Sequence, residues 1–413
     1  MQDVLAQVVR EEWGRLVALL LARFRRLDLV EDALGDAVEA AARTWPRDGA
    51  PNNPAGWLMT TAQRRVIDRL RAEAMAHRRH AVIATDLDRR GPGVGDLADP
   101  GDLVEDDLLR LVLMCTHPAL APDAASALAL RLVLGVSTAD IARLFLVQES
   151  TMAARITRAK KKIVTAGVPF AIPGADVLPD RLATVAQTAY LAFTAGYAPA
   201  SGPDPVRAEL AGEAVRLART VLALRPHDPT LTALLALMLL QHSRRDARVD
   251  GDGELVLLPD QDRSRWHHDE VTEAVPLLAA PVLAGALPAQ AAAYLIQARI
   301  AAEHATAPTP EATRWDRIVT GYDLLLQLDP SPAGRLARAV AVAEASGPAA
   351  GLAALSEVEL PGSHRVPAVR AELLARLGER AAALEAFDEA LGLCQNVAET
   401  SHLERRRADV VGS

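Results

Sequence analysis

Aromatic residues are scarce in this sequence, which has only five Trp, four Tyr and five Phe among 413 residues. β-Sandwiches and barrels draw heavily on aromatic and β-branched side chains, whereas the abundant Ala and Leu favour helices. Half of the residues are hydrophobic and 24% are charged, a balance that excludes a chain disordered throughout. The composition therefore predicts an all-α protein, and the length predicts two to four domains.

Cysteine is almost absent, and long apolar runs are missing. Cys115 and Cys394 lie far apart and form no CxxC pair, which argues against a disulfide framework or a cysteine zinc site and fits a reducing cytoplasm. The longest apolar run, residues 231–240, is about half a membrane span, and the first residues carry acids rather than a signal core. We predict a cytoplasmic protein with no membrane association, no cofactor and no metal.

Charge is unevenly distributed along a chain whose net charge is −8. Basic stretches lie at residues 60–80 and 150–165, and the stretch between them, 86–107, is strongly acidic. Within it, GPGVGDLADPGD is too rich in Gly, Pro and Asp for a helix or a packed core, which predicts a flexible linker. A second break is VPFAIPGADVLPD. These breaks predict helical domains at 1–82, 105–167 and 181–413, joined by linkers at 83–104 and 168–180.

The second predicted domain has the pattern of a helix-turn-helix. Ser137 or Thr138 can cap the short helix ADIARLF, and a second helix follows from about Glu149. Its core face carries Met152 and Ile156. The opposite face suits a recognition helix, because small polar residues can reach base edges and basic ones can reach phosphates. The predicted DNA-contacting residues are Ser150, Thr151, Ala154, Arg155, Thr157, Arg158 and Lys161.

An arginine-rich helix over 57–79 ends the first predicted domain, after the turn-forming loop PRDGAPNNPAG. A charged helix face is often merely solvated. Two basic modules inside an acidic protein nevertheless favour contacts with phosphates.

The last 240 or so residues contain a weak internal repeat. The segments GPAAGLAALSEVEL, from Gly347, and GERAAALEAFDEAL, from Gly378, overlay at a shift of 31 to 32 residues. This shift is close to the tetratricopeptide period of 34 residues. An α-solenoid-like domain is therefore expected, and the number of its units is open.

Enzyme signatures are missing: the sequence has no Gly-rich phosphate loop, no HExxH and no GxSxG. One cluster, residues 247–270, resembles the front of a calcium loop, but its twelfth position is the neutral Gln261. We interpret VDGDGE there as a hairpin turn. The neighbouring Asp260, Asp262, Arg263 and Arg265 are expected to form a structural ion-pair network.

Two segments resemble a known family. EDALGDAVEAAARTWPRDGAPNNPAGWLMTTAQRRVIDRLR resembles region 2 of the extracytoplasmic-function (ECF, sigma-70 group four) sigma factors of bacterial RNA polymerase. LRLVLGVSTADIARLFLVQESTMAARITRAKKKI resembles region 4 of the same class. The order of the segments and the acidic linker agree over residues 1–165. The remainder is similar to the C-terminal extension of one subgroup, in the stretch DGELVLLPDQDRSRW and in the tetratricopeptide-like tail.

The resemblance implies roles for particular residues. The helix 28–45 would dock on core RNA polymerase through Asp28, Glu31, Asp32 and Asp36. The loop and helix after it would melt the minus-ten promoter element, using Asn52, Asn53, Trp57, Arg64, Arg65, Arg69 and Arg71. The helix from Ser150 would read the minus-thirty-five element. The sequence departs from the family at Gly35, where Gln is usual, and at Arg64, where an Asn commonly helps to read a flipped base.

The leading hypothesis is a sigma factor without catalytic chemistry of its own. Its extension would either regulate it through an internal contact with regions 2 and 4 or add contacts to the polymerase. The alternative is an ordinary helix-turn-helix repressor or activator with a helical sensor domain, which would bind duplex DNA without polymerase. A third hypothesis is an enzyme that acts on a small molecule at residues 250–268.

Overall fold

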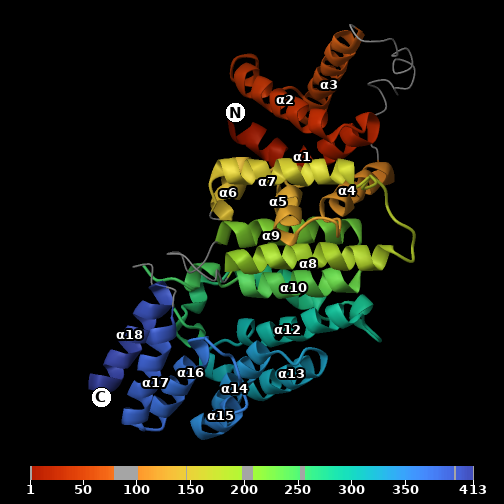
Figure 1. The fold of residues 1–413 in the computed structure, drawn as a ribbon. Coiled ribbons are helices and arrows are strands. Elements are labelled where there is room, and N and C mark those ends of the chain that lie inside the picture. The colour runs from red at the N-terminus through yellow and green to blue at the C-terminus, as the bar shows by residue number, and fades with distance from the viewer. Residues whose placement is uncertain are drawn as a thin grey trace. The chain divides into compact units, whose positions relative to one another are not determined.

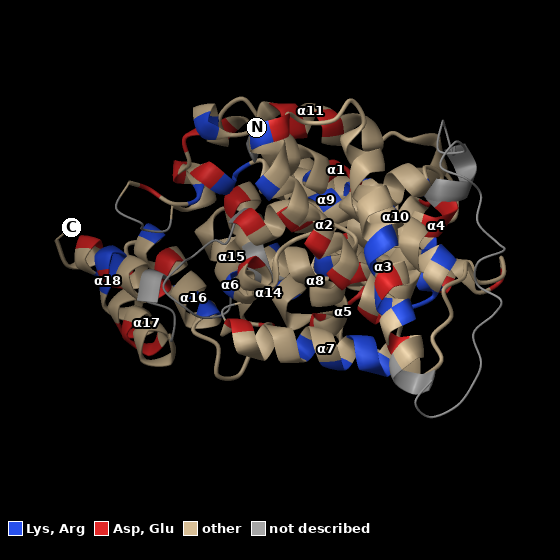
Figure 2. Cartoon of the chain, turned by 90° about the horizontal axis from the view of Figure 1, so that it is seen from above, with Lys and Arg blue, Asp and Glu red and all other residues tan. Residues whose placement is uncertain are grey.

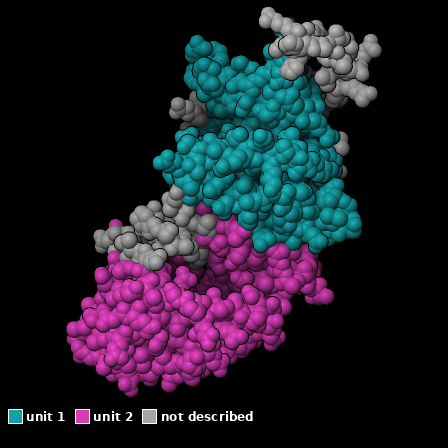
Figure 3. Space-filling model, in the orientation of Figure 1, with its two compact units in different colours: residues 1–189 teal, residues 190–413 magenta. Residues whose placement is uncertain are grey.

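The computed structural model describes residues 2–78, 101–145, 147–197, 208–251, 256–394 and 397–412. Within these ranges the regular elements are 18 α-helices and a few 3-10 turns, and no β-strand is present (Figure 1). The predicted all-α class is confirmed. The chain forms two compact units, residues 1–189 and residues 190–413 (Figure 3).

Three long helices open the first unit. Their apolar side chains recur every three or four residues, so each helix buries one face. Leu20, Leu34 and Leu58, one from each helix, are fully buried. The helices are α1 (Gln2–Phe24), α2 (Leu27–Asp48) and α3 (Pro54–Arg78).

Four further helices complete most of the first unit. They are α4 (Gly101–Cys115), α5 (Pro122–Leu132), α6 (Thr138–Leu144) and α7 (Glu149–Thr165). Helix α4 begins inside the segment 83–104 that the sequence predicts as a linker, because apolar residues already recur at helical spacing from Leu103 onward. The rest of that segment, including GPGVGDLADP, lies outside the described residues.

The boundary between the units falls inside one helix, α8 (Leu178–Tyr197). Residues 168–177, where the sequence predicts a break, contain no helix. The first half of α8 belongs to the first unit: Val185 and Ala189 are buried, and the Ser126 hydroxyl donates to the Thr188 carbonyl at 3.3 Å. A truncation that keeps the first unit intact must therefore keep this helix.

The second unit is built around α10 (Pro229–His242), the helix that contains the longest apolar run of the sequence. All of its residues from Thr230 to Leu240 are buried, as expected of a helix that is apolar on every face and central in a core. Its neighbours are α9 (Ala208–Leu224), α11 (His268–Leu277) and α12 (Ala289–Ala305). No helix in the described part of the chain has the length and apolar character needed to cross a bilayer.

The remaining six helices each pack mainly on their neighbours in the sequence. The repeat detected in the sequence falls on two of them, and in both copies the glycine before the helix has a positive φ: 92° at Gly347 and 78° at Gly378. L-Residues with side chains rarely adopt this conformation, so both copies require glycine here. The helices are α13 (Trp315–Leu328), α14 (Pro332–Ser346), α15 (Pro348–Leu355), α16 (Arg365–Arg376), α17 (Arg380–Leu393) and α18 (Val397–Gly412).

Candidate nucleic-acid interface

The predicted helix-turn-helix is formed by α6 and α7. Ser137 caps α6: its hydroxyl accepts from the Asp140 backbone N–H at 3.0 Å and donates to the Asp140 carboxylate at 2.6 Å. Such a cap satisfies one of the backbone donors that a helix start leaves unpaired. Helix α7 begins at Glu149 and turns Met152 and Ile156 into the core, as predicted from their spacing.

The outer face of α7 is open and basic (Figure 2). Six of the seven residues predicted to contact the minus-thirty-five element are exposed: Ser150, Thr151, Ala154, Thr157, Arg158 and Lys161. The seventh, Arg155, is half-buried, and its guanidinium lies 3.7 Å from the Asp123 carboxylate at the start of α5. The helix therefore presents small polar side chains near its N-terminus and cations after them, the order that a recognition helix needs.

At the start of α3, two of the predicted minus-ten residues have structural roles. The Asn53 side-chain oxygen accepts from the Gly56 N–H at 2.8 Å and so caps the helix. Trp57 packs edge-on against Trp45 with 5.6 Å between ring centroids. Asn52 is exposed, so its side chain is open to contact with the predicted minus-ten element.

The arginines predicted for the minus-ten element divide into two groups. Arg64, Arg65 and Arg71 are exposed along α3. Arg69 instead pairs with two of the acids predicted to bind polymerase, Asp36 at 2.8 Å and Asp32 at 3.7 Å. Arg69, which is predicted to contact DNA, thus pairs with acids that are predicted to bind polymerase, and these ion pairs join α3 to α2.

Asp28, the first acid of the predicted docking helix, lies at the surface of the first unit. It bonds the Arg26 guanidinium at 2.8 Å, and this hydrogen bond lowers the pKa of its carboxyl group. Arg26 also pairs with Glu73 of α3 at 3.1 Å. Asp28 is nevertheless exposed to solvent.

Glu31 is not at the surface, contrary to the expectation for a docking acid. Its side chain is only 6% exposed and bonds two cations from α5 and α7. The Arg131 Nε of α5 donates at 2.6 Å, and the Lys160 ammonium of α7 bonds the other oxygen. Arg131 also lies over the Trp13 ring, and the Trp13 indole donates to the Arg131 carbonyl at 3.1 Å.

One buried carboxylate therefore lies at the contact between the two helical blocks of the first unit, α1–α3 and α4–α7. We call Glu31, Arg131, Lys160 and Trp13 the Glu31 cluster. Sequence reasoning did not find it, because Glu31 is separated from its partners by 100 and 129 residues. Glu31 cannot reach another protein while it holds both cations.

Comparison with known proteins places the helix-turn-helix in a defined class. A family model described as sigma-70, region 4, matches residues 110–163, which include α5, α6 and most of α7. This part of the chain is a sigma-70 region 4 domain. A region 4 domain implies interaction with RNA polymerase and promoter DNA, and the exposed face of α7 in this domain carries small polar and basic side chains.

The similarity of the chain to other proteins extends beyond region 4. It is 42% identical over 390 residues to an uncharacterized protein of Rhizobium meliloti (strain 1021), and the match covers 93% of this chain and 90% of that protein. A family of unknown function (DUF6596) matches residues 181–281, from α8 to α11. No solved structure matches the chain.

The acidic cluster at 247–270 lies within the matched part of the second unit, and the predicted ion-pair network there is wrong. Asp262 caps a 3-10 turn by accepting from the Ser264 N–H at 2.9 Å. Arg263 donates to the His304 and Ala307 carbonyls, both at 2.8 Å, and Arg265 donates to the Val249 carbonyl. The two arginines therefore bond backbone carbonyls rather than the neighbouring carboxylates, which an inspection of charge alone does not show.

The predicted hairpin turn of this cluster is only partly described. Asp252 and Glu254, at the tip of the predicted hairpin, lie outside the described residues. The Val256 N–H donates to the Arg248 carbonyl at 2.9 Å, so the chain does return on itself. Nearby, burial and the cations Arg244 and Arg263 lower the pKa of His304 to about 4. This imidazole is therefore neutral near pH 7.

Proposed function

We propose that the chain is an ECF-type sigma factor that binds core RNA polymerase and directs it to promoters with minus-ten and minus-thirty-five elements. It would have no catalytic role of its own. The observation that carries the proposal is the open basic face of α7, behind a capped α6, in a domain that matches region 4. Region 2 is proposed from the resemblance of α2 and α3 and from the exposed arginines of α3.

Electrostatics support DNA binding by these two surfaces in spite of the net charge of −8. Binding to DNA draws mainly on local cations that displace counterions from phosphates. Arg158 and Lys161 on α7, and Arg64 and Arg65 on α3, are exposed. They can therefore reach phosphates without first losing a buried partner.

The test is co-elution of the purified chain with bacterial core RNA polymerase, followed by run-off transcription on genomic fragments. A sigma factor forms a stable complex with the core enzyme and produces new start sites, whose upstream sequences reveal both promoter elements. Tight binding to duplex DNA without polymerase would instead support a repressor or activator with a helical sensor domain.

Removing the two exposed cations of α7 should weaken promoter binding and reduce its salt dependence. Each phosphate contact contributes about 0.9 to the slope of log affinity against log salt concentration. The double variant Arg158→Ala, Lys161→Ala is therefore expected to lower this slope by about 2. The measurement is promoter binding by the reconstituted holoenzyme over a salt series. Arg335→Ala, which removes an exposed cation of α14 in the second unit, is the control, and an equal slope in both variants would contradict this role for α7.

We further propose that the second unit modulates the first, as a helical repeat surface that can bind a neighbouring domain or a peptide. Truncation after Tyr197 removes the second unit except for residues 190–197 and keeps α8, whose first half is part of the core of the first unit. Transcription from a cognate promoter is expected to change in rate or in its response to added core enzyme. A truncated chain with unchanged transcription would exclude modulation.

A further inference from the structure

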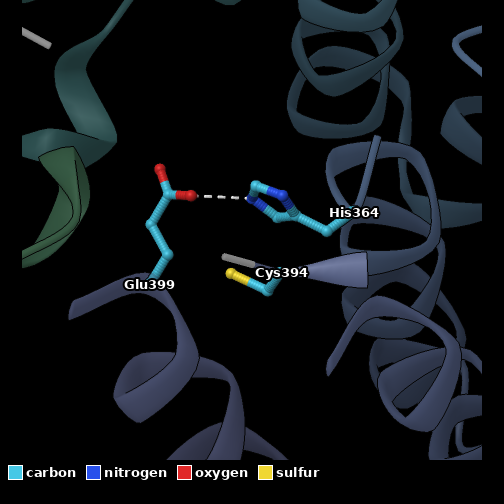
Figure 4. Close-up of side chains that lie close together, drawn as sticks. All are labelled: His364, Cys394 and Glu399. Atoms are coloured by element: carbon cyan, nitrogen blue, oxygen red, sulfur yellow. Dashed lines mark ion pairs between the residues drawn. The ribbon is translucent and has the colours of Figure 1, made fainter. Parts of the chain in front are cut away.

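Three side chains with metal-binding atoms meet in the second unit, among α16, α17 and α18 (Figure 4). His364 immediately precedes α16, Cys394 immediately follows α17, and Glu399 lies in the first turn of α18. Their imidazole nitrogen, sulfur and carboxylate oxygen all lie within 4.8 Å of one another. The His364 Nε2 is 2.7 Å from Glu399 Oε2. Each side chain is partly buried, which shields it without closing it to solvent.

Zinc in proteins is held by this combination of atoms. Thiolate sulfur, imidazole nitrogen and carboxylate oxygen bind Zn²⁺ at about 2.0–2.3 Å in tetrahedral geometry. Ligand atoms that already lie within 4.8 Å of one another need only small side-chain movements to reach such distances. We propose that His364, Cys394 and Glu399 bind a divalent transition metal ion, Zn²⁺ in the first place, with water as the fourth ligand.

The ion pair between His364 and Glu399 accounts for only part of this arrangement. It joins the start of α16 to α18, and Arg365 lies 3.9 Å from the other Glu399 oxygen. Cys394 packs at the edge of the apolar cluster that contains Phe387 and Ala390. A metal would connect the thiol to the ion pair, because the imidazole nitrogen that now faces the carboxylate would face the metal.

Metal binding would fix the ends of three helices at one point. Helix α18 packs Leu403 and Val410 into the apolar cluster of α16 and α17, and it is also joined to its neighbours by exposed or half-buried ion pairs, Arg406 with Glu372 at 2.8 Å and Arg407 with Asp388 at 2.7 Å. Such pairs contribute little each. A bound ion stabilises the folded state by an amount that grows with its concentration above the dissociation constant. The thiol must lose its proton to bind, so binding should weaken as the pH falls.

The test is titration of the untagged full-length chain with Co²⁺, a spectroscopic substitute for Zn²⁺. The expected result is one equivalent bound, with thiolate-to-cobalt charge-transfer absorption that Zn²⁺ abolishes. The chain has only two cysteines, and the other, Cys115, is fully buried in the first unit. Cys115→Ala should therefore keep the absorption, and Cys394→Ser should lose it.

Affinity for Zn²⁺, measured by competition with a chelating dye, gives a second readout. Loss of an outer partner of a metal ligand typically costs 10- to 100-fold in affinity, so loss of the ligand itself in His364→Gln should cost at least about 100-fold. His227→Gln, which changes an exposed histidine, should bind as the unchanged chain does.

The effect of Zn²⁺ on the melting temperature tests the metal site in each variant separately, so the variants need not be equally stable. Zn²⁺ should raise the melting temperature of the unchanged chain and of Cys115→Ala, but not that of Cys394→Ser. Absence of the charge-transfer absorption in the unchanged chain would overturn the proposal and leave a His–Glu ion pair alone. The measurement needs neither polymerase nor DNA, so it fails or succeeds independently of the proposed sigma function.

Discussion

Replacing Glu31 with Gln is expected to destabilise the first unit by about 3 kcal/mol, at the low end of the range for removing one partner of a buried ion pair. The carboxylate is 6% exposed and holds Arg131 and Lys160 together. A neutral amide leaves two like charges side by side with no anion between them. The value lies at the low end because both cations are about one-fifth exposed and can regain water.

Hydrogen exchange of the backbone amides of α2 and α5 in the full-length chain measures this loss within the first unit. Glu39→Gln is a matched control on the same helix, because Glu39 is 64% exposed and pairs with the exposed Arg43, at 3.3 Å. An exposed pair of this kind is worth at most about 1 kcal/mol. Equal protection in the two variants would show that the Glu31 cluster is not formed in solution.

The same variant tests the docking role of Glu31 separately. If the carboxylate contacts polymerase, the two helical blocks of the first unit must move apart at the Glu31 cluster before the complex forms. Glu31→Gln would then favour the separated state but remove the docking charge. We expect a faster approach to equilibrium with core polymerase and a weaker complex, whereas Asp28→Asn, which alters an acid that is already exposed, should weaken the complex without changing the rate.

Local patterns were sufficient to predict the helices and the helix-turn-helix. The Ser137 cap, the buried Met152 and Ile156, and the start of α7 at Glu149 depend on residues within one or two turns. The exposed face of α7 follows from the same periodicity. These features could be predicted because propensity, capping and burial all agree there.

Contacts between distant segments could not be predicted in the same way. Glu31 has the position of a surface acid in α2, and only the packing of α5 and α7 makes it a buried partner. Likewise, the sequence predicts no metal site, because its two cysteines form no pair. The proposed ligands His364, Cys394 and Glu399 come from the ends of three helices, and their separations of 30 and 5 residues match no metal-binding motif.

Replacing Gly14 with Ala is expected to destabilise the first unit, although the same change at Gly35 should stabilise it. Both glycines are inside helices, where Ala is favoured over Gly by about 1 kcal/mol. A Cβ at Gly35 would meet nothing within 4 Å, so the full gain is expected there. A Cβ at Gly14 would overlap the Val133 carbonyl oxygen at the end of α5 and lie 3.0 Å from its carbon.

The overlap at Gly14 involves backbone rather than a flexible side chain, so α1 must move away from α5. Overpacking typically costs about 1–3 kcal/mol, and the movement would also disturb the bond from the Trp13 indole to the Arg131 carbonyl. We expect a net loss of about 2 kcal/mol for Gly14→Ala, measured by hydrogen exchange in α1 and α5. Increased protection in both glycine variants would mean that α1 and α5 do not approach each other this closely, and the Glu31 cluster would then lose its geometric basis.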